Sequence, residues 1–273
     1  MYRTTLFLVG LFAAQAPAHA VTYPPVEEFV QHVRAALSDP FDTAGVTYVE
    51  QRRDIDISML GKVTVGPLRT FEVVASPAPG RTYKRLVAIN GEPLDEQELA
   101  RRDAEHERHL REAARRTERE SPRERADRLR AEAEERRDTD AILDDAVTVF
   151  APVFAGREVI DGRHVLVVDL HPREDVEPAT RQGRWMKHFR GRIWVDNADY
   201  EIVRLDMHAF RDITVGWGVI GRINEGSRIV FSRRRRADRW VPAELSYEAS
   251  GRTLLVRPFR FAITTTYSDY KPS

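Results

Sequence analysis

The feature that most constrains the fold is a run of strand-like segments joined by short turns, which extends from Pro152 almost to the end of the chain. Neighbouring strands joined by short turns pair with each other in antiparallel order. The second half of the chain is therefore predicted to form an antiparallel meander. Its predicted segments are His164–Leu170, Arg192–Val195 with a turn at Asp196–Asp199, Tyr200–Phe210, Arg228–Arg236 with a turn near Ala237, Trp240–Tyr247, a turn at Ser250–Gly251, and Thr253–Tyr267.

The N-terminal part combines a helix with a further hairpin. In Val26–Leu37 apolar residues recur at helical spacing, which predicts a short amphipathic helix. After Val46 the period changes to two, and a turn at Pro77–Gly80 separates the strands Thr70–Ala75 and Arg81–Ile89. Helices that are grouped in two places, rather than alternating with strands, indicate an α+β fold and not a parallel doubly wound sheet.

A highly charged stretch at about residues 94–150 separates the early strands from the late ones and is predicted to be a helical insertion. Its helices are expected at Asp95–Glu120, Pro122–Arg137 and Thr139–Val149. The second should begin with a capping box made by Ser121 and Glu124.

The three predicted helices of the insertion differ in what can stabilise them. The first two contain few large apolar residues, so i,i+4 pairs such as Glu107 with Arg111 and Glu112 with Arg116 should contribute ~0.2–0.5 kcal/mol each. They are expected to be largely solvated arms. The third is expected to dock on the core through an apolar stripe made of Ile142, Leu143, Ala146, Val147 and Phe150.

The first twenty residues have the pattern of a cleavable secretory signal. Arg3 supplies a positive charge, Leu6–Ala14 is an apolar run too short to span a bilayer, and a small-x-small site precedes Val21. Cleavage is therefore expected between Ala20 and Val21, which predicts a periplasmic or secreted protein with residues 21–273 as one domain. The sequence contains no cysteine, so neither disulfides nor a lipid-modified N-terminal cysteine is expected.

Two segments imitate functional motifs without the required context. Gly216–Gly221 matches the letters GxGxxG, but a strand rather than a helix is expected after it, so we interpret it as a bend in the sheet. His106 and His109 are spaced i,i+3, not i,i+4 as in a zincin helix. The sequence therefore predicts no catalytic, cofactor-binding or metal-binding residue. A hydrolase remains an alternative if histidines converge with a carboxylate in one pocket; the candidates are His164, His171, His188 and His208.

The most basic run of the chain consists of Arg233, Arg234, Arg235 and Arg236. On a strand these side chains alternate between faces, so at most two of them share a surface. The run is interpreted either as a solvated strand end or as a contact for anionic lipid headgroups or an acidic partner. In an exported protein without a broad basic surface, nucleic acid is not an expected partner.

The order of a signal, an amphipathic helix, a long meander and an inserted helical stretch resembles the periplasmic lipoprotein carriers of the LolA and LolB type and the RseB-like sensors. The segment Gly191–Leu205, the tripeptide Trp240-Val241-Pro242 and the closing strand Thr253–Tyr267 carry most of this resemblance. The charged insertion is longer than such carriers usually have. The resemblance implies a curved, open half-barrel sheet with helices covering one face and an apolar cavity between them.

A carrier of this kind needs no catalyst, because burying an acyl chain gains about 0.8 kcal/mol per methylene. The expected function is therefore an exported, non-catalytic carrier or binding protein for lipid or lipid-modified polypeptide. Candidate cavity-lining residues are Val165, Val167, Ile193 and Val195. The alternative from another class is an envelope interaction or sensor protein that binds a protein partner through helices at about 95–137.

Overall fold

The computed structural model describes residues 22–37, 46–58, 62–75, 82–215, 221–253 and 257–272. The predicted signal segment, with its cleavage point between Ala20 and Val21, and Gly216–Ile220 of the glycine motif lie outside the described residues. The helices are α1 (Val26–Ala36), α2 (Glu96–Glu118), α3 (Pro122–Thr148) and α4 (Arg181–Met186). The strands are β1 (Val46–Ile57), β2 (Val63–Val65), β3 (Arg69–Ala75), β4 (Thr82–Ile89), β5 (Glu92–Pro93), β6 (Phe150–Ile160), β7 (Arg163–Pro172), β8 (Phe189–Asp196), β9 (Ile202–Ala209), β10 (Ile213–Val215), β11 (Gly221–Ile223), β12 (Arg228–Arg236), β13 (Arg239–Thr253) and β14 (Arg257–Pro272).

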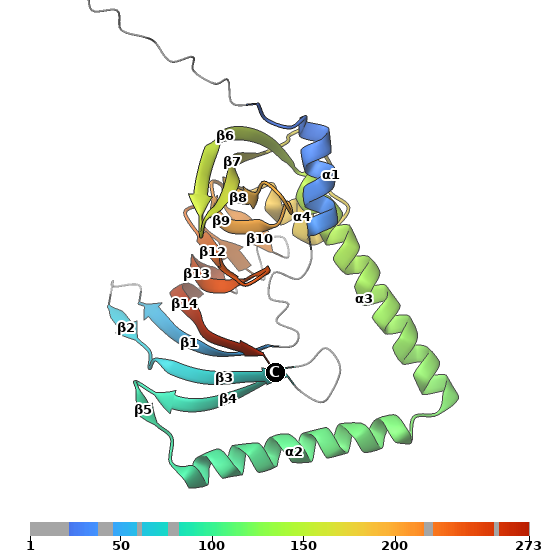
Figure 1. Cartoon of the computed structure of the whole chain (residues 1–273), viewed down its shortest axis with the longest axis vertical. Helices are drawn as coiled ribbons and strands as arrows, with labels where there is room; N and C mark the ends of the chain where they lie inside the picture. Colours follow the sequence, from blue (N-terminus) through green and yellow to red (C-terminus); the bar gives the residue numbers. More distant parts are fainter. Residues whose placement is uncertain are drawn as a thin grey trace, which may run out of the picture.

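All the strands belong to one antiparallel sheet of 14 strands, whose main path runs β5-β4-β3-β1-β14-β13-β12-β9-β8-β7-β6. The path begins at β5 and ends at β6, so the sheet is open rather than closed into a barrel. This confirms the predicted α+β class and the curved antiparallel half-barrel (Figure 1). The first and last strands, β1 and β14, lie side by side and join the two ends of the chain in the middle of the sheet.

Helices α2 and α3 connect the two outer ends of this path, because α2 follows β5 and α3 leads into β6. The helices contain 23 and 27 residues, which at 1.5 Å per residue correspond to about 35 and about 40 Å. Figure 1 shows them as two sides of a triangle whose third side is the sheet. We call this pair of helices the arm.

Helix α3 is one long helix where two, Pro122–Arg137 and Thr139–Val149, were predicted. The expected break between Arg137 and Thr139 is wrong, because α3 is continuous from Pro122 to Thr148. Thr139 donates its hydroxyl hydrogen bond to the carbonyl oxygen of Glu135, one turn back, so it stays in the helix instead of capping a new one. No proline or glycine interrupts α3 after its first residue.

A second correction concerns the predicted turn at Ser250–Gly251, since β13 runs straight through both residues. Gly251 is needed there for space. A Cβ atom at this position would lie 2.0 Å from the carbonyl oxygen of Arg222 on the neighbouring strand β11. The other predicted hairpins, β3 with β4, β8 with β9 and β12 with β13, are confirmed, as is the N-terminal helix.

The centre of β7 is buried on both faces, which explains its almost unbroken apolar sequence. One face contributes to a cluster that includes α1: Phe29, Val33, Leu166, Val168, Ile193 and Val195. The opposite face contributes to a second cluster: Val165, Val167, Trp194, Val203 and Trp240. None of the helices in the described parts of the chain is long and apolar enough to cross a membrane.

Candidate functional site

A wholly apolar cavity of about 390 Å³ lies between the sheet and the helices α1, α3 and α4. Each side chain that lines it is aliphatic, aromatic or a methionine: Phe29, Val30, Val33, Leu37, Ala146, Val147, Phe150, Pro152, Leu170, Met186, Phe189, Ile193, Ile202, Leu205, Met207 and Ile229. Apolar pockets of about 300–1,000 Å³ are the usual sites for small ligands. No group in this lining can ionise, donate a hydrogen bond or act as a nucleophile. The cavity can therefore bind an apolar group, but it offers no residue for catalysis.

Helix α1 forms one wall because its apolar residues repeat at helical spacing. Phe29 is 2% exposed and Val33 is 6% exposed. The ring of Phe29 meets that of Phe154 edge to face, with 5.1 Å between centroids, which fixes the helix against β6. On its outer side Arg34 donates a 2.6 Å hydrogen bond to Asp144, so α1 is also joined to the end of α3.

Helix α4 is held in place by one buried carboxylate. Asp145, 5% exposed on α3, accepts hydrogen bonds from the backbone N–H groups of Ala179 (3.0 Å) and Thr180 (2.8 Å) and from the Thr180 hydroxyl. Gly183 is required beside it, because an added Cβ would lie 2.2 Å from a carboxylate oxygen of Asp145. This contact sets the start of α4 and thereby places Met186 in the cavity wall.

Two opposing effects act on the pKa of Asp145. Burial raises it, but the hydrogen bonds from Thr180 and Ala179 outweigh burial and hold the pKa below its ordinary value. The carboxylate is therefore charged at neutral pH, and it is stabilised mainly by neutral hydrogen-bond donors, with a smaller effect from the charge of Arg184.

Most of the predicted docking stripe reaches the cavity. Three of its five residues line the cavity: Ala146 and Val147 near the end of α3, and Phe150 at the start of β6. Asp145 was not anticipated. Two adjacent aspartates, Asp144 and Asp145, lie between the apolar residues Leu143 and Ala146, and the sequence does not show which of them is buried.

The four candidate lining residues are divided between the two faces of the sheet. Ile193 lines the cavity, and Val195 belongs to the same buried cluster as Phe29. Val165 and Val167 point to the opposite face, where they pack in the cluster that contains Trp194 and Trp240. The residues of β7 that share a face with Ile193 are Leu166, Val168 and Leu170.

The apolar lining continues along the same face of the sheet beyond the cavity. Ile229 of the lining lies opposite Tyr247 on β13, and Tyr247 lies opposite Ile263 on β14. Residues that pair directly across neighbouring strands share a face. The ring of Tyr247 approaches that of Phe261, with 5.7 Å between centroids. The half-buried aromatic surface of β13 and β14 therefore adjoins the cavity.

Two residues of the arginine run, Arg233 and Arg235, form contacts within the protein. Arg233 forms an ion pair with Glu201 and donates a 2.8 Å hydrogen bond to the carbonyl oxygen of Trp240. The Arg235 guanidinium lies 5.7 Å from the centroid of the Trp240 ring and 3.5 Å from a carboxylate oxygen of Asp199. Arg234 is half-buried within β12, and Arg236 is exposed at the hairpin end.

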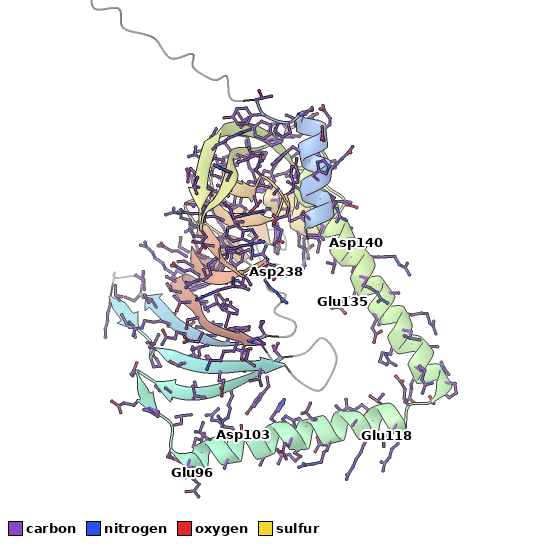
Figure 2. The ribbon with its side chains drawn as sticks, viewed as in Figure 1. Glu96, Asp103, Glu118, Glu135, Asp140 and Asp238 are labelled. Carbon is purple, nitrogen blue, oxygen red and sulfur yellow. The ribbon has the colours of Figure 1, made fainter. Side chains whose placement is uncertain are left out.

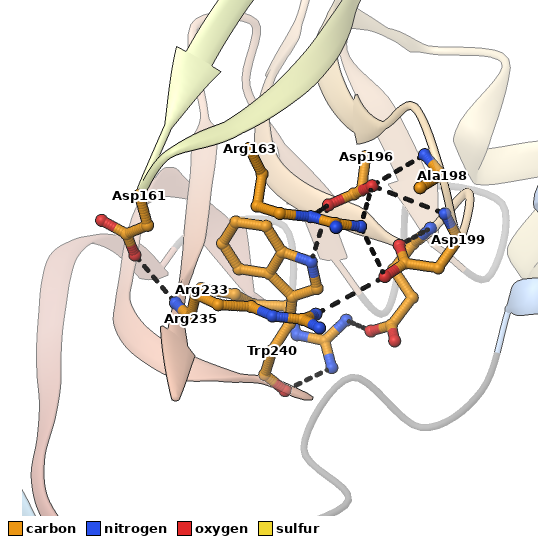
Figure 3. Close-up of polar contacts among 9 residues, drawn as sticks. Asp161, Arg163, Asp196, Ala198, Asp199, Arg233, Arg235 and Trp240 are labelled. Carbon is orange, nitrogen blue, oxygen red and sulfur yellow. Dashed lines mark hydrogen bonds and ion pairs between the residues drawn. The ribbon is translucent and has the colours of Figure 1, made fainter. Parts of the chain in front are cut away.

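Around Arg235 the tips of two hairpins meet over the buried Asp196 (Figure 3). Asp196 accepts two 2.8 Å hydrogen bonds from Arg163 and one of 3.2 Å from the indole N–H of Trp240. Burial raises the pKa of Asp196, but the Arg163 guanidinium and the backbone N–H of Ala198 lower it by more than burial raises it. The pKa of Asp196 therefore lies below its ordinary value. These contacts join the β6–β7 hairpin to the β12–β13 hairpin.

Two of the four candidate histidines share an open groove on the face opposite the cavity. His171 and His208 line it together with Asp169 and Asp206. Both carboxylates are engaged by arginines: Arg192 donates to Asp169 at 2.6 Å, and Arg228 donates to Asp206 at 2.8 Å. A carboxylate held by a guanidinium is a weak base, because the pKa of each acid is lowered.

The remaining histidines are not brought into this groove. His188 is half-buried, and burial lowers its pKa, with the charge of Arg211 acting in the same direction. On the arm, His106 stacks on Tyr83 of β4 with 3.7 Å between ring centroids. Within the described ranges no group of three or more histidine, aspartate or glutamate residues is placed to hold a metal ion.

No protein-family model matches the sequence, and no curated protein matches it at a significant level. Several solved structures resemble the chain in layout. A domain assigned to the outer membrane lipoprotein-sorting proteins, from Vibrio parahaemolyticus, is 8% identical, with 91% of this chain and 94% of that domain covered and a TM-score of 0.34. A LolA superfamily protein from Nitrosomonas europaea is 10% identical, with 93% and 94% covered and a TM-score of 0.26.

MucB from Pseudomonas aeruginosa, solved as a complex with MucA, is 8% identical, with 91% of this chain and 99% of that chain covered and a TM-score of 0.20. The expected resemblance to LolA-type and RseB-like proteins is thus confirmed as a structural resemblance. These low scores assign neither a ligand nor a partner to this chain, so its function has to be argued from the chemistry of its own cavity.

Proposed function

We propose that the protein is an exported, non-catalytic carrier or binding protein that shelters an acyl chain of a lipid, or of a lipid-modified polypeptide, in the cavity beneath α1, α3 and α4. The observation that carries this proposal is the wholly apolar lining of the cavity. A ligand with a polar group inside it would lose its hydrogen bonds to water without replacing them, which costs roughly 2–7 kcal/mol per group. The cavity therefore selects hydrocarbon.

The size of the cavity fits a chain rather than a compact metabolite. One water molecule takes about 30 Å³ of the liquid, and a methylene group is of similar size. A volume of about 390 Å³ therefore has room for about a dozen methylenes. Their transfer from water would contribute about 10 kcal/mol before ordering costs. The adjoining surface around Tyr247 and Phe261 offers further apolar contact for a longer chain.

The test combines detection of a native ligand with a variant that fills the cavity. The chain from Val21 onward is purified and examined by native mass spectrometry for co-purifying lipid, and its affinity for a fluorescent fatty acid is measured. Ala146→Leu adds three carbon atoms to the cavity wall, so about 2 kcal/mol of chain burial is lost. The affinity should fall by roughly tenfold to fiftyfold.

The matched control is Ala114→Leu, the same change at an exposed position of α2, which should leave the affinity unchanged. A protein that carries no lipid and binds no fatty acid would contradict the proposal. Equal affinity in the two leucine variants would also contradict it, because binding would then take place elsewhere.

A further inference from the structure

At the bend of the arm lies a group of arginines whose side chains have no partner among the described residues. We define the elbow as residues 112–128, which include the end of α2 and the start of α3. Four arginine side chains of the elbow form no ion pair or hydrogen bond with any described residue: Arg115, Arg116, Arg119 and Arg123. The expected pair between Glu112 and Arg116 is not formed in the described structure.

Most other arginines of the arm are paired within the described structure, and Arg136 and Arg137 of α3 are the exceptions. Arg101 and Arg102 both bind Glu98, at 2.8 and 2.7 Å. Arg111 binds Glu107 at 3.1 Å, and this pair was predicted from the sequence. Beyond the elbow α3 becomes acidic, with Glu135 and Asp140 among many exposed carboxylates (Figure 2). Four of the six arginines of the arm that have no described partner therefore lie at the elbow, where six arginines outnumber five carboxylates.

The elbow has a defined structure, which is held by a capping box and by ion pairs across the bend. The Ser121 hydroxyl accepts from the backbone N–H of Glu124 at 3.2 Å, and the Glu124 carboxylate accepts from the backbone N–H of Ser121 at 2.8 Å. Arg128 binds both Glu120, on the other side of the bend, and Glu132, one turn further along α3. The side chain of Glu120 is only 10% exposed as a result. These contacts fix the angle between the helices and hold the free arginines on one corner.

A crevice of about 540 Å³ opens at this corner, and three of the free arginines, Arg115, Arg116 and Arg119, line it together with Glu112 and Glu120. Its dimensions and its guanidinium groups suit a phosphate-bearing group, because guanidinium donors match phosphate oxygens in geometry and charge. Figures 1 and 2 show the corner at the vertex of the triangle, away from the sheet and from α1 and α4. A flat surface can therefore reach it without obstruction.

We propose that the elbow binds anionic phospholipid headgroups and so docks the protein on a membrane surface. Residues 112–128 contain no aromatic residue and, apart from Pro122, no aliphatic residue larger than alanine. Tight protein–protein contacts depend on buried aromatic or aliphatic anchors, which the elbow lacks. Binding to an anionic membrane surface does not require such buried side chains, because each arginine near the lipid phosphates contributes about 1 kcal/mol of binding free energy.

This docking does not depend on the proposed acyl-chain site, because the two sites lie on different parts of the molecule and use different chemistry. The cavity contains no charged side chain, whereas the elbow consists mainly of charged residues. If both proposals hold, the elbow brings the carrier to the layer in which its ligand resides.

The test measures co-sedimentation of the chain from Val21 onward with vesicles made of equal parts phosphatidylcholine and phosphatidylglycerol, and with vesicles of phosphatidylcholine alone. The wild type should bind the anionic vesicles only, and less tightly as salt is raised. The elbow variant replaces Arg115, Arg116, Arg119 and Arg123 by glutamine, whose helix propensity is similar. At about fivefold per arginine, its affinity should fall more than tenfold even with the neighbouring glutamates opposing the effect.

The matched control removes the same charge from the same arm outside the elbow, with glutamine at Arg101, Arg108, Arg136 and Arg137; it should bind within about threefold of the wild type. Equal binding by the elbow variant and the control would overturn the proposal, as would binding to neutral vesicles. Failure to bind anionic vesicles, together with elbow-dependent binding of poly-glutamate, would overturn it in favour of an acidic polypeptide partner. The elbow variant should retain fatty-acid binding, and Ala146→Leu should retain vesicle binding, which separates this test from that of the cavity.

Discussion

The two ends of helix α3 differ in what stabilises them. Between Arg123 and Asp140 nearly every residue is exposed, and the helix is supported by its capping box and by pairs such as Arg128 with Glu132. From Ala141 onward the same helix is mostly half-buried. Its Ala146 and Val147 line the cavity, and its Asp145 binds the start of α4.

This difference indicates that the arm is stabilised by other interactions than the cavity region, by which we mean the cavity-lining residues and the elements that carry them. Local pairs and caps contribute from a few tenths to about 1 kcal/mol each and act over one or two turns. Burial and buried hydrogen bonds contribute several kcal/mol and couple distant segments. The cavity region should therefore unfold as one cooperative unit, whereas the free part of the arm should loosen without it.

The largest expected difference between the regions comes from removing one large apolar side chain in each. Phe29→Ala should lower the free energy of unfolding by about 3–5 kcal/mol, because Phe29 is nearly fully buried among α1, β6 and the cavity. Urea unfolding followed by tryptophan fluorescence measures this change, since all four tryptophans lie outside the arm.

The matched change on the arm is Leu129→Ala, at a side chain that is 49% exposed. Its effect on the same transition should stay within about 0.5 kcal/mol. Similar losses in the two variants would show that the arm unfolds together with the cavity region, and the distinction between them would be lost.

The next largest effect is expected at Asp145. Asp145→Asn should destabilise the protein by about 2–3 kcal/mol at neutral pH, because the amide NH₂ group cannot accept from the donors that the carboxylate satisfies. Its neighbour Asp144 is exposed and pairs with Arg34, so Asp144→Asn should cost at most about 1 kcal/mol. Urea unfolding of the two variants, which carry the same change one residue apart, measures the difference.

The same carboxylate should make stability depend on pH. The pKa of Asp145 in the folded protein lies below its ordinary value, which is about 3.9 in an unfolded chain. Its contribution is therefore fully present above that value and is lost as the pH falls through the lower, folded pKa. Asp145→Asn should flatten the loss of stability in this acidic range; an unchanged pH profile would mean that other carboxylates dominate it.

Periodicity and turn residues were sufficient to predict the antiparallel meander, α1 and three hairpins, because each of these features is encoded within a short segment. The pairing of β1 with β14 was not accessible in this way. It joins Val49 to Ser268 across almost the whole chain, and no local pattern specifies which distant strand a segment will join. The continuity of α3 through Thr139 was missed because a threonine that could cap a helix can also bond back to the preceding turn.

The resemblance implied a cavity, but the sequence itself did not distinguish an open cavity from a filled interior and did not identify the walls. A strand that is apolar on both faces, such as β7, does not reveal which face a helix covers, so Val165 and Leu166 cannot be told apart by sequence. The contact between Asp145 and Thr180 also depends on α4 folding back onto α3. By contrast, the capping box at Ser121 lies within four residues and was predicted correctly.

The smallest expected effect compares two helix caps. Ser121→Ala removes the side-chain acceptor at the start of α3, which should cost about 1 kcal/mol locally. Because the elbow has little tertiary packing, this loss should increase hydrogen exchange of residues near 112–130 while the urea midpoint measured by tryptophan fluorescence stays unchanged.

Thr180→Ala is the matched change at the start of α4, where the hydroxyl accepts from the N–H of Gly183 at 2.8 Å and also donates to Asp145. Its loss leaves a buried carboxylate with one donor fewer, so it should lower the urea midpoint itself. If Ser121→Ala lowered the midpoint as much as Thr180→Ala, the elbow would have to be part of the cooperative unit. Headgroup binding at the elbow would then change the free energy of unfolding of the elements around the cavity. The two places are 20 residues apart along α3, from Asp127 to Val147.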